Sequence, residues 1–219
     1  MNRKLKKDLQ EFFELYLSFE LSNQKFNGHS CILGRLDVID DEGIFWKSFK
    51  LSILIDEDSY PYTVPQVYVK DEEIRRDQDW HIDRNGLCCL DIPHKLILMK
   101  NRRINISRFF KEVIYPFFSN YCYKEKVGKY ANGEYDHDAK GIIQFYREEF
   151  GITDPQNAVQ ILNISLDSTN KMRRNDHCPI CRSQKIKKCC WRTIKDLQRI
   201  DRKQLISDHE MFSSLAKQK

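Results

Sequence analysis

The chain has 219 residues, of which 41% are hydrophobic, and it carries a formal net charge of +5. This length, with 13 Phe, 10 Tyr and 3 Trp, suffices for one ordinary domain and a small appendage, which excludes disorder throughout. The longest aliphatic runs, such as residues 96–99, are far shorter than the roughly 20 residues that cross a bilayer. The basic start leads into an amphipathic pattern rather than a secretory signal, so we expect a cytoplasmic protein without a membrane partner.

The first 70 residues combine a helical pattern with strand patterns. Apolar residues recur at three- and four-residue spacing over residues 4–20, which predicts an amphipathic helix. Residues 31–39 and the alternating stretch 45–55 predict two strands, and the Asp/Gly turn between them predicts a hairpin. The prolines that follow predict a rigid crossing to a short strand at residues 67–69.

The rest of the chain is mainly helical in pattern. An apolar face runs through residues 109–118, a helix is predicted at 139–150, and Thr153-Asp154-Pro155 is a helix-start signal. Because strands and helices are segregated along the chain, we predict the α+β class.

Residues 81–91, with the sequence HIDRNGLCCLD, contain a histidine, a glycine and a cysteine pair. A nucleophilic cysteine needs exposure, a route to the thiolate and a donor for the oxyanion. Gly86 allows a tight turn before the cysteines, and His81 is close enough in sequence to act as donor or base. The alternative is a buried strand at residues 87–90, since free cysteine is a common core residue. These residues alone leave both interpretations open.

Two short motifs occur in a recognisable order. Residues 60–65 read Tyr-Pro-x-x-x-Pro, and residues 85–91 read Asn-Gly-x-x-Cys-Leu-Asp. Following a helix and a strand meander, they resemble the ubiquitin-conjugating (UBC) enzyme fold in its divergent bacterial form. The resemblance covers roughly residues 1–150 and implies a UBC-like antiparallel meander flanked by helices.

The UBC resemblance assigns roles to single residues. Aligned on Gly86, Cys89 stands at the thioester-forming position and Cys88 at the usual aliphatic neighbour. Where the family has His-Pro-Asn, whose Asn supports the oxyanion, residues 79–81 are Asp-Trp-His. Either His81 takes the donor role, or the loop is two residues shorter and His81 replaces the structural histidine. Such an enzyme passes the C-terminus of a protein from the cysteine to an amine, and this step needs no small cofactor.

The UBC resemblance also implies partners. Bacterial relatives occur in antiphage operons, including cyclic-oligonucleotide signalling systems, so the substrate would be a ubiquitin-like protein or a signalling nucleotidyltransferase with a free C-terminus. A separate activating enzyme would supply the acyl group, because this sequence has no nucleotide-binding glycine loop. The rival interpretation is a catalytically inactive module that captures a protein tail. The missing Asn favours the module, and the retained Gly-x-x-Cys-Leu-Asp favours the enzyme.

A second cysteine cluster lies in a basic segment. Residues 171–203 carry 12 Lys/Arg and 3 Asp/Glu, a net of +9, whereas residues 1–170 carry 23 against 27, a net of −4. Four thiols within thirteen residues have the ligand count of a tetrahedral structural zinc site, and in the absence of a secretory signal, metal binding outranks disulfides. A segment this short would depend on the metal for its stability. The predicted ligands are Cys178, Cys181, Cys189 and Cys190.

The same segment resembles the SEC-C zinc motif. Residues 174–176, Cys178-Pro179 and residues 187–190 match it, but its usual Cys-x-Cys is Cys-x-x-Cys here. This makes Cys181 the least certain ligand, with His177 as the substitute. The surrounding basic residues would attract an acidic protein face or nucleic-acid phosphates. Aromatic residues for base stacking are scarce, which favours protein docking over nucleic acid.

These patterns together predict four regions. We expect a UBC-like conjugating domain at residues 1–152, a linker with a short helix at 153–172, a SEC-C-like zinc knuckle at 173–192 and a basic helical tail at 193–219.

Overall fold

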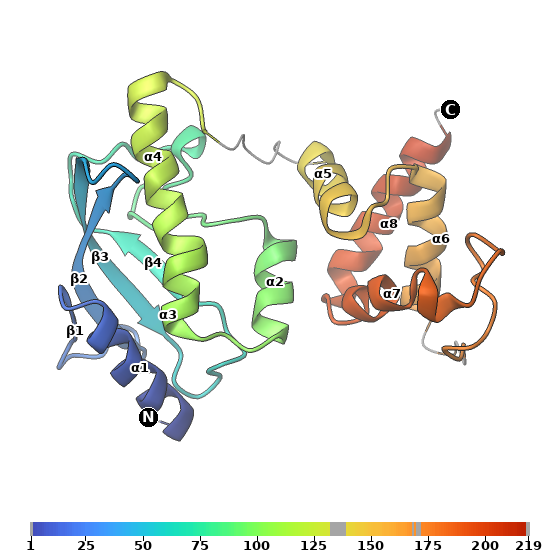
Figure 1. Ribbon diagram of the computed structural model, residues 1–219, viewed down its shortest axis with the longest axis horizontal. Helices are drawn as coiled ribbons and strands as arrows, with labels where there is room; N and C mark the ends of the chain where they lie inside the picture. Colours follow the sequence, from blue (N-terminus) through green and yellow to red (C-terminus); the bar gives the residue numbers. More distant parts are fainter. Residues whose placement is uncertain (1, 132–138, 168, 170–171, 218–219) are drawn as a thin grey trace. The chain divides into compact units, whose positions relative to one another are not determined.

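The computed structural model describes residues 2–131, 139–167, 169 and 172–217 (Figure 1). Its contacts divide the chain into two compact units, Met1–Glu134 and Tyr135–Lys219. The first unit contains a four-stranded antiparallel sheet with helices, and the second is built from helices, so the predicted α+β class is confirmed. Among the described residues, no helix has the length and apolar character needed to cross a membrane.

The first unit begins with α1 (Arg3–Leu15) and continues into a sheet with strand order β1-β2-β3-β4. The strands are β1 (Phe19–Leu21), β2 (Ser30–Ile39), β3 (Phe45–Ile55) and β4 (Gln66–Val69). After the sheet come η1 (Gln78–Trp80), α2 (Pro93–Asn101), α3 (Ile106–Phe109), the π turn η2 (Phe110–Ile114) and α4 (Tyr115–Val127). The predicted hairpin and the short strand after it are therefore confirmed as β2, β3 and β4.

One predicted feature of this unit needs correction, and one helix of this unit was missed. The helix predicted over residues 4–20 ends at Leu15, and residues 19–21 form β1 instead. Leu17 is 87% exposed, whereas Phe19 is buried in the core. Phe19 pairs with Gly34, where a Cβ atom would lie 2.3 Å from the phenyl ring, so the strand pairing depends on that glycine. Helix α2, with Pro93 in its first turn, was not predicted.

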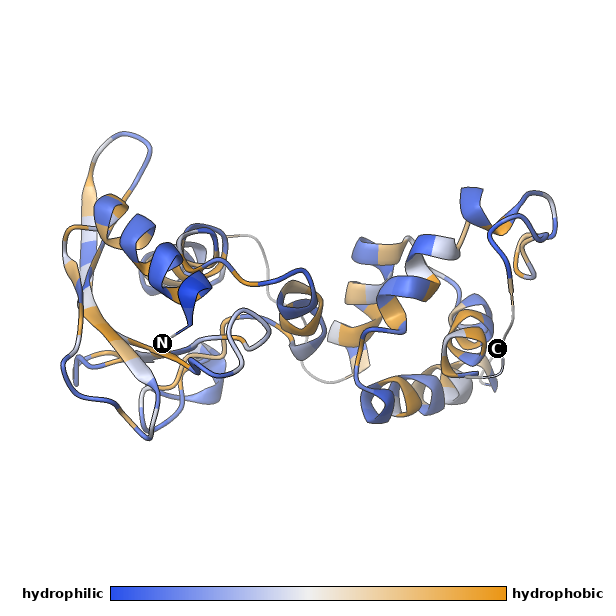
Figure 2. Cartoon of the chain, turned by 90° about the horizontal axis from the view of Figure 1, so that it is seen from below, coloured by the Kyte–Doolittle hydropathy of each residue, from blue (hydrophilic) through white to orange (hydrophobic). Residues whose placement is uncertain are grey.

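One face of the sheet carries the core of the first unit. Side chains of α1, β2, β3, α3 and α4 meet there, and the strands and helices in Figure 2 show mixed hydrophobic and hydrophilic faces. Phe12 packs edge-on against Phe110 with ring centroids 5.4 Å apart, and Phe49 packs against Phe118 at 4.5 Å. All four rings are fully buried, which fixes α1 against η2 and α4 against β3.

The second unit consists of α5 (Ala139–Phe150), α6 (Pro155–Leu166), η3 (Ile186–Lys188), α7 (Trp191–Leu197) and α8 (Arg202–Lys217). The Tyr146 hydroxyl donates a hydrogen bond to Asp208 at 2.8 Å, and its ring packs against Phe212. The Arg202 guanidinium donates to the Leu166 carbonyl at 2.8 Å. These contacts place α5 and α6 with α8 in one helical unit, whereas the predicted organisation put α5 in the first domain and α6 in a linker.

Candidate functional site

A glycine turn leads into the cysteine pair. The Gly86 amide donates to the Asp83 carbonyl at 2.9 Å, and the Asp83 carboxylate accepts the amides of Asn85 and Leu87 at 2.8 Å each. Gly86 has a φ of +86°, and a Cβ atom there would lie 2.3 Å from the Val69 carbonyl oxygen. Only glycine fits this close approach to β4 without a shift of the backbone.

Backbone hydrogen bonds hold the cysteine pair on both sides. The Cys88 amide donates to the Val67 carbonyl of β4 at 2.8 Å, and the Cys89 amide donates to the His81 carbonyl at 2.8 Å. Cys88 is buried with 6% of its surface exposed, whereas Cys89 is exposed. The buried-strand alternative therefore describes Cys88 but not Cys89.

The two thiols differ in their chemistry as well as in their exposure. Burial raises the pKa of the Cys88 thiol to about 12, so this thiol stays protonated at neutral pH. Partial burial of its sulfur, and to a smaller degree the charge of Asp91, raise the pKa of Cys89 above its ordinary value of 9.0. Cys89 is accessible to a partner, but its surroundings do not stabilise the thiolate.

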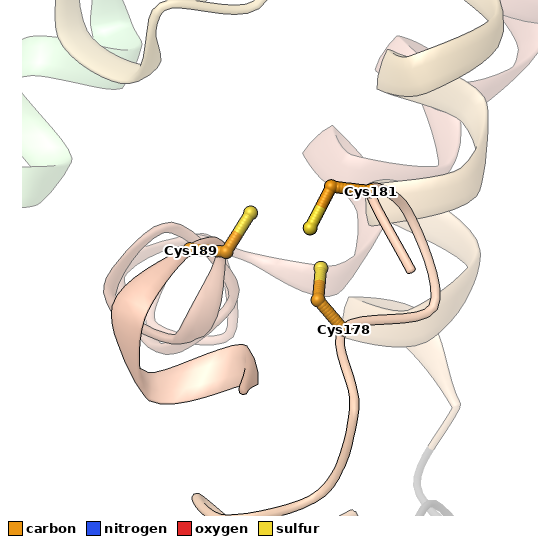
Figure 3. A group of neighbouring side chains, drawn as sticks. All are labelled: Cys178, Cys181 and Cys189. Atoms are coloured by element: carbon orange, nitrogen blue, oxygen red, sulfur yellow. The ribbon is translucent and has the colours of Figure 1, made fainter. Parts of the chain in front are cut away.

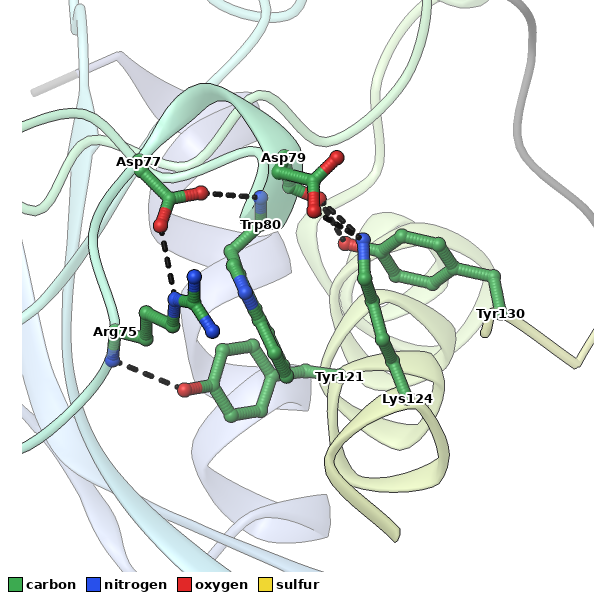
Figure 4. Close-up of polar contacts among 7 residues, drawn as sticks. All are labelled: Arg75, Asp77, Asp79, Trp80, Tyr121, Lys124 and Tyr130. Carbon is green, nitrogen blue, oxygen red and sulfur yellow. Dashed lines mark hydrogen bonds and ion pairs between the residues drawn. The ribbon is translucent and has the colours of Figure 1, made fainter. Parts of the chain in front are cut away.

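A buried lysine holds the turn at Asp79 (Figure 4), and the carbonyl of His81, at the end of this turn, accepts the Cys89 amide. Lys124 of α4 donates to the Asp79 carbonyl at 2.5 Å and lies 3.6 Å from the Asp79 carboxylate. Its ammonium is 4.2 Å from the ring centroid of Tyr130 and 5.2 Å from that of Trp80. The Tyr130 hydroxyl also donates to the Asp79 carbonyl, at 3.2 Å. These contacts connect α4, and Tyr130 in the segment after α4, to the turn that ends at His81.

A second set of contacts fixes the start of the same turn. The Asp77 carboxylate caps η1 by accepting the Trp80 amide at 3.1 Å, and it accepts the Arg75 side chain at 2.9 Å. The Trp80 ring packs against Tyr121 of α4 at 4.6 Å. His81 follows in the left-handed conformation, with a φ of +54°. Its ring centroid is 5.7 Å from that of Tyr130.

The side chains contributed by α4 and Tyr130 could not be found from the sequence. Lys124 acts 45 residues after Asp79, and Tyr130 acts 51 residues after it. No local pattern marks either residue as a neighbour of the cysteine turn. Both belonged to a stretch in which only helical periodicity and loop residues were evident.

The second candidate site is a group of converging sulfur atoms (Figure 3). The sulfurs of Cys178, Cys181 and Cys189 all lie within 4.8 Å of one another. The Cys190 sulfur lies 3.1 Å from that of Cys178 and 3.2 Å from that of Cys189. The structure therefore brings the four predicted ligands together. Among the described residues, the converging group includes Cys181 and not the substitute, His177.

The local backbone explains this convergence. An antiparallel bridge pairs His177 with Lys185, and the Cys178 amide donates to the Gln184 carbonyl at 2.8 Å, which closes a loop around Cys181. Cys190 is the N-cap residue of α7. The loop closed by this bridge thus supplies the thiols of Cys178 and Cys181, and the segment that leads into α7 supplies those of Cys189 and Cys190.

The sulfur cluster has a donor set suited to a metal ion. Tetrahedral coordination at about 2.3 Å would place the sulfurs about 3.8 Å apart; the sulfurs of Cys178, Cys181 and Cys189 lie within 4.8 Å of one another, and Cys190 lies closer than this ideal to Cys178 and Cys189. Burial and the adjacent thiols raise the pKa of Cys190, while a hydrogen bond from Ser183 lowers the pKa of Cys181 to about 6. A cation would favour the thiolate form of all four side chains. The cluster can therefore hold a metal ion.

The surface beside the sulfur cluster is strongly basic. Within the described residues, six exposed basic side chains around the knuckle form no ion pair with a carboxylate. By contrast, Arg192 and Arg199 both lie within 4.0 Å of Asp196. The six unpaired residues are Arg173, Arg174, Arg182, Lys185, Lys187 and Lys188.

Comparison of the chain with protein-family models, with curated proteins and with solved structures finds no match. The UBC and SEC-C resemblances therefore remain predictions that rest on the motifs in the sequence.

Proposed function

We propose that the chain is a ubiquitin-conjugating-like acyl transferase that carries an acyl group on Cys89 as a thioester and passes it to an amine. The observation that carries this proposal is the exposed thiol of Cys89 beside the buried Cys88, on a turn bonded to β4 and to His81. This arrangement offers one accessible sulfur at a fixed backbone position. The motif order at residues 60–65 and 85–91 supports the same assignment.

The first step suits an activated acyl donor. The Cys89 thiolate attacks the carbonyl carbon of a donor thioester, a new carbon–sulfur bond forms, and the donor leaves as a thiolate that takes a proton from solvent. The raised pKa of Cys89 limits the amount of thiolate but increases the nucleophilicity of the thiolate that is present. Exchange with a reactive thioester is therefore feasible, whereas attack on a free carboxylate is not. For this reason the proposal includes a separate activating enzyme.

The second step releases Cys89. A neutral amine attacks the thioester carbonyl, the carbon–nitrogen bond forms, and Cys89 leaves as a thiolate while the amine proton passes to solvent. The Cys89 amide is already bonded to the His81 carbonyl, so it does not serve as the oxyanion donor. We assign that role to the imidazole of His81, which stands where the UBC family has an asparagine.

The proposed substrate is a protein with a free C-terminus. A ubiquitin-like protein or a signalling nucleotidyltransferase fits the bacterial antiviral context that the UBC resemblance implies. The exposed position of Cys89 suits a large acyl donor.

For the second unit, we propose a structural zinc ion held by Cys178, Cys181, Cys189 and Cys190. A donor set of four cysteine thiolates suits zinc among the common metals. The unpaired basic side chains around the knuckle then form a docking surface for an acidic protein partner. Nucleic acid is the less favoured partner, because Trp191 is the one aromatic residue within this basic segment.

One observation favours the alternative function, an inactive module that binds a protein tail. The pKa of Cys89 is raised, and the charged group that acts on its thiol is the carboxylate of Asp91, which opposes thiolate formation. A module that only captures a tail would not need a reactive Cys89. The experiment must therefore test the reactivity of this thiol directly.

The test uses a defined acyl donor, the N-acetylglycylglycine thioester of 2-mercaptoethanesulfonate, with the purified full-length chain. We expect acylation of Cys89 that dithiothreitol reverses, located by mass spectrometry of peptides. Cys88→Ser should be acylated at Cys89 as fast as the wild type, and Cys89→Ser should lose the reversible product. Acylation confined to other cysteines would refute the enzyme and favour the binding module.

A further inference from the structure

A shallow pocket lies in the helical unit, between α6, η3 and α7. Five of its seven lining residues are hydrophobic: Ile164, Met172, Ile186, Trp191 and Ile194. Ile186 and Ile194 are buried, whereas the other three are half-buried and reach the surface of the unit. The pocket therefore presents apolar side chains to solvent at one defined place.

The size of the pocket suits one small side chain. It has about 30 Å³ of room for the centres of water-sized spheres, and it is partly open to solvent. One water needs roughly 10–15 Å³ on the same measure, so two or three waters, or the branched end of an aliphatic side chain, would fill it. Water beside an apolar wall has few hydrogen-bond partners, and methyl groups that replace it gain apolar contact. The pocket is therefore suited to an aliphatic side chain that enters from a partner.

A lysine lies at the rim of this pocket. The Lys195 ammonium donates to the Gln198 side chain at 2.9 Å, and it is 5.0 Å from the ring centroid of Trp191. These contacts hold the ammonium beside the apolar lining, although Lys195 itself is exposed. An ammonium at the mouth of an apolar pocket is complementary to a carboxylate that neighbours an apolar side chain.

Backbone hydrogen bonds join the pocket to the basic side chains of the knuckle. The Ile186 amide donates to the Asp176 carbonyl at 2.8 Å, and the Lys187 amide donates to the Arg174 carbonyl at 3.2 Å. These bonds bring two segments of the knuckle together, and each segment supplies one residue to the pocket. Met172 lies two residues before Arg174, and Ile186 directly precedes Lys187. The apolar pocket thus borders the surface proposed to dock an acidic partner.

We infer that this pocket anchors the acidic partner by taking one aliphatic side chain from a segment in which carboxylates flank that side chain. The inference rests on the docking surface proposed for the second unit and not on acyl transfer at Cys89. Charge complementarity identifies the occupant, because its carboxylates would meet Lys195 and the unpaired basic side chains around the knuckle. A nucleic acid would meet the same charges, but a base is too large for a pocket of this size. The pocket therefore adds a contact that a plain polyanion cannot make.

The experiment compares two fluorescein-labelled peptides that differ in one side chain. The first is Asp-Glu-Asp-Leu-Asp-Glu-Asp, and the second has serine in place of leucine. Binding of each peptide to the purified full-length chain is measured by fluorescence anisotropy. We expect the leucine peptide to bind about tenfold more tightly, as the partial burial of one leucine side chain predicts. Added salt should weaken the binding of both peptides, since both contain the same carboxylates.

Two variants separate the apolar contact from the charge. Ile164→Ser, which changes a half-buried wall residue, should remove the advantage of the leucine peptide and leave the affinity of the serine peptide unchanged. Lys195→Glu should weaken the binding of both peptides. Lys203→Glu, an equal change of charge at an exposed position of α8 outside the pocket lining, should have a smaller effect. Met172→Ser repeats the wall test if melting curves show that Ile164→Ser is unfolded.

Each contrary outcome has a separate meaning. Equal affinities for the two peptides would overturn the anchor pocket and leave the basic docking surface in place. A leucine advantage that survives both wall variants would also overturn it, because the side chain would then bind elsewhere. An oligouridylate that binds more tightly than the leucine peptide would show that the surface prefers nucleic acid. If neither peptide binds, the proposed docking surface is itself refuted, whereas the proposed role of Cys89 is unaffected.

Discussion

The backbone amide of Cys89 donates a hydrogen bond to the carbonyl oxygen of His81 at 2.8 Å. This bond ties the exposed thiol to a turn that Lys124 and Tyr130 hold through the Asp79 carbonyl. The position of Cys89 therefore depends on contacts made far away in the sequence. Because the Cys89 amide is already bonded to the His81 carbonyl, it is not available to a developing oxyanion.

The pH dependence of thiol alkylation should distinguish the two adjacent cysteines. Because the pKa of Cys89 lies above 9.0, its reaction with iodoacetamide should keep accelerating as the pH rises through 9. Cys88, with its pKa raised to about 12 and its sulfur buried, should stay unmodified over the same range. Asp91→Asn should speed the alkylation of Cys89, since it removes the charge that opposes the thiolate. Faster modification of Cys88 than of Cys89 would contradict this description.

Loss of the Lys124 ammonium should weaken the turn that holds Cys89. In Lys124→Met, the Asp79 carbonyl loses a donor and the rings of Trp80 and Tyr130 lose a cation, so unfolding in urea should show a loss of about 1–3 kcal/mol. Amide hydrogen exchange at residues 79–89 should also increase. Lys129→Met, at an exposed position in the segment after α4, is the control and should change neither measurement.

Glycine should be required at position 86 for a steric reason beyond its backbone conformation. Gly86 and Gly43 have similar positive φ angles of +86° and +81°, but only Gly86 would place a Cβ atom against a backbone oxygen. Gly43→Ala should cost about 1 kcal/mol, the ordinary cost of the left-handed conformation. Gly86→Ala should cost at least about 2 kcal/mol more, because the Val69 carbonyl must move. Equal losses for the two variants, measured by urea unfolding, would show that the close approach has no energetic consequence.

Acid should remove a defined part of the stability of the first unit. A hydrogen bond from Ser30, together with the Lys25 ammonium at 3.1 Å, lowers the pKa of Glu57 to about 2 from an ordinary value of 4.5. Because the pKa is lower in the folded state, this contribution is complete above pH 4.5 and disappears as the pH falls towards 2. Ser30→Ala should therefore destabilise the protein more at pH 7 than at pH 2.5 in urea titrations. A difference that is independent of pH would exclude this linkage.

Metal removal should affect the second unit selectively. We expect one zinc ion per chain by elemental analysis, and a chelator should lower the melting temperature of the helical unit, which buries Ile186 and Ile194 close in sequence to Cys189 and Cys190. Cys178→Ser should lose the metal because it removes a buried ligand. The control Cys31→Ser, which changes a buried cysteine of β2, should keep the metal. A native protein that contains no metal and melts unchanged with a chelator would refute the zinc site.

The sequence was sufficient for the features that local patterns determine. Periodicity predicted β2, β3 and the helix at residues 139–150, and close spacing predicted the convergence of the four C-terminal cysteines. The sequence was not sufficient where a contact with a residue far away in the chain determines where an element ends or to which unit it belongs. The pairing of Phe19 with Gly34 ended the first helix early, and the contact of Tyr146 with Asp208 placed α5 in the second unit.

The candidate site likewise combines features that the sequence predicted with features that only the fold reveals. The glycine and the cysteine pair were evident from residues 85–89, and the exposure of Cys89 beside buried Cys88 agrees with their predicted separation. The raised pKa of Cys89 depends mainly on how the folded chain buries its sulfur, and the anchoring of its turn depends on Lys124 of α4. Neither can be deduced from spacing along the chain.

The most direct test of the central claim is a trap for the acylated chain in the cells from which the sequence comes. Tagged Cys89→Ser protein, purified under denaturing conditions, should carry a protein adduct through an ester that hydroxylamine cleaves, and Cys88→Ser should carry the same adduct through a thioester that dithiothreitol cleaves. Mass spectrometry should identify the C-terminus of the attached protein on residue 89. If neither variant nor the wild type carries an adduct at residue 89, an acyl-carrying role for Cys89 is contradicted.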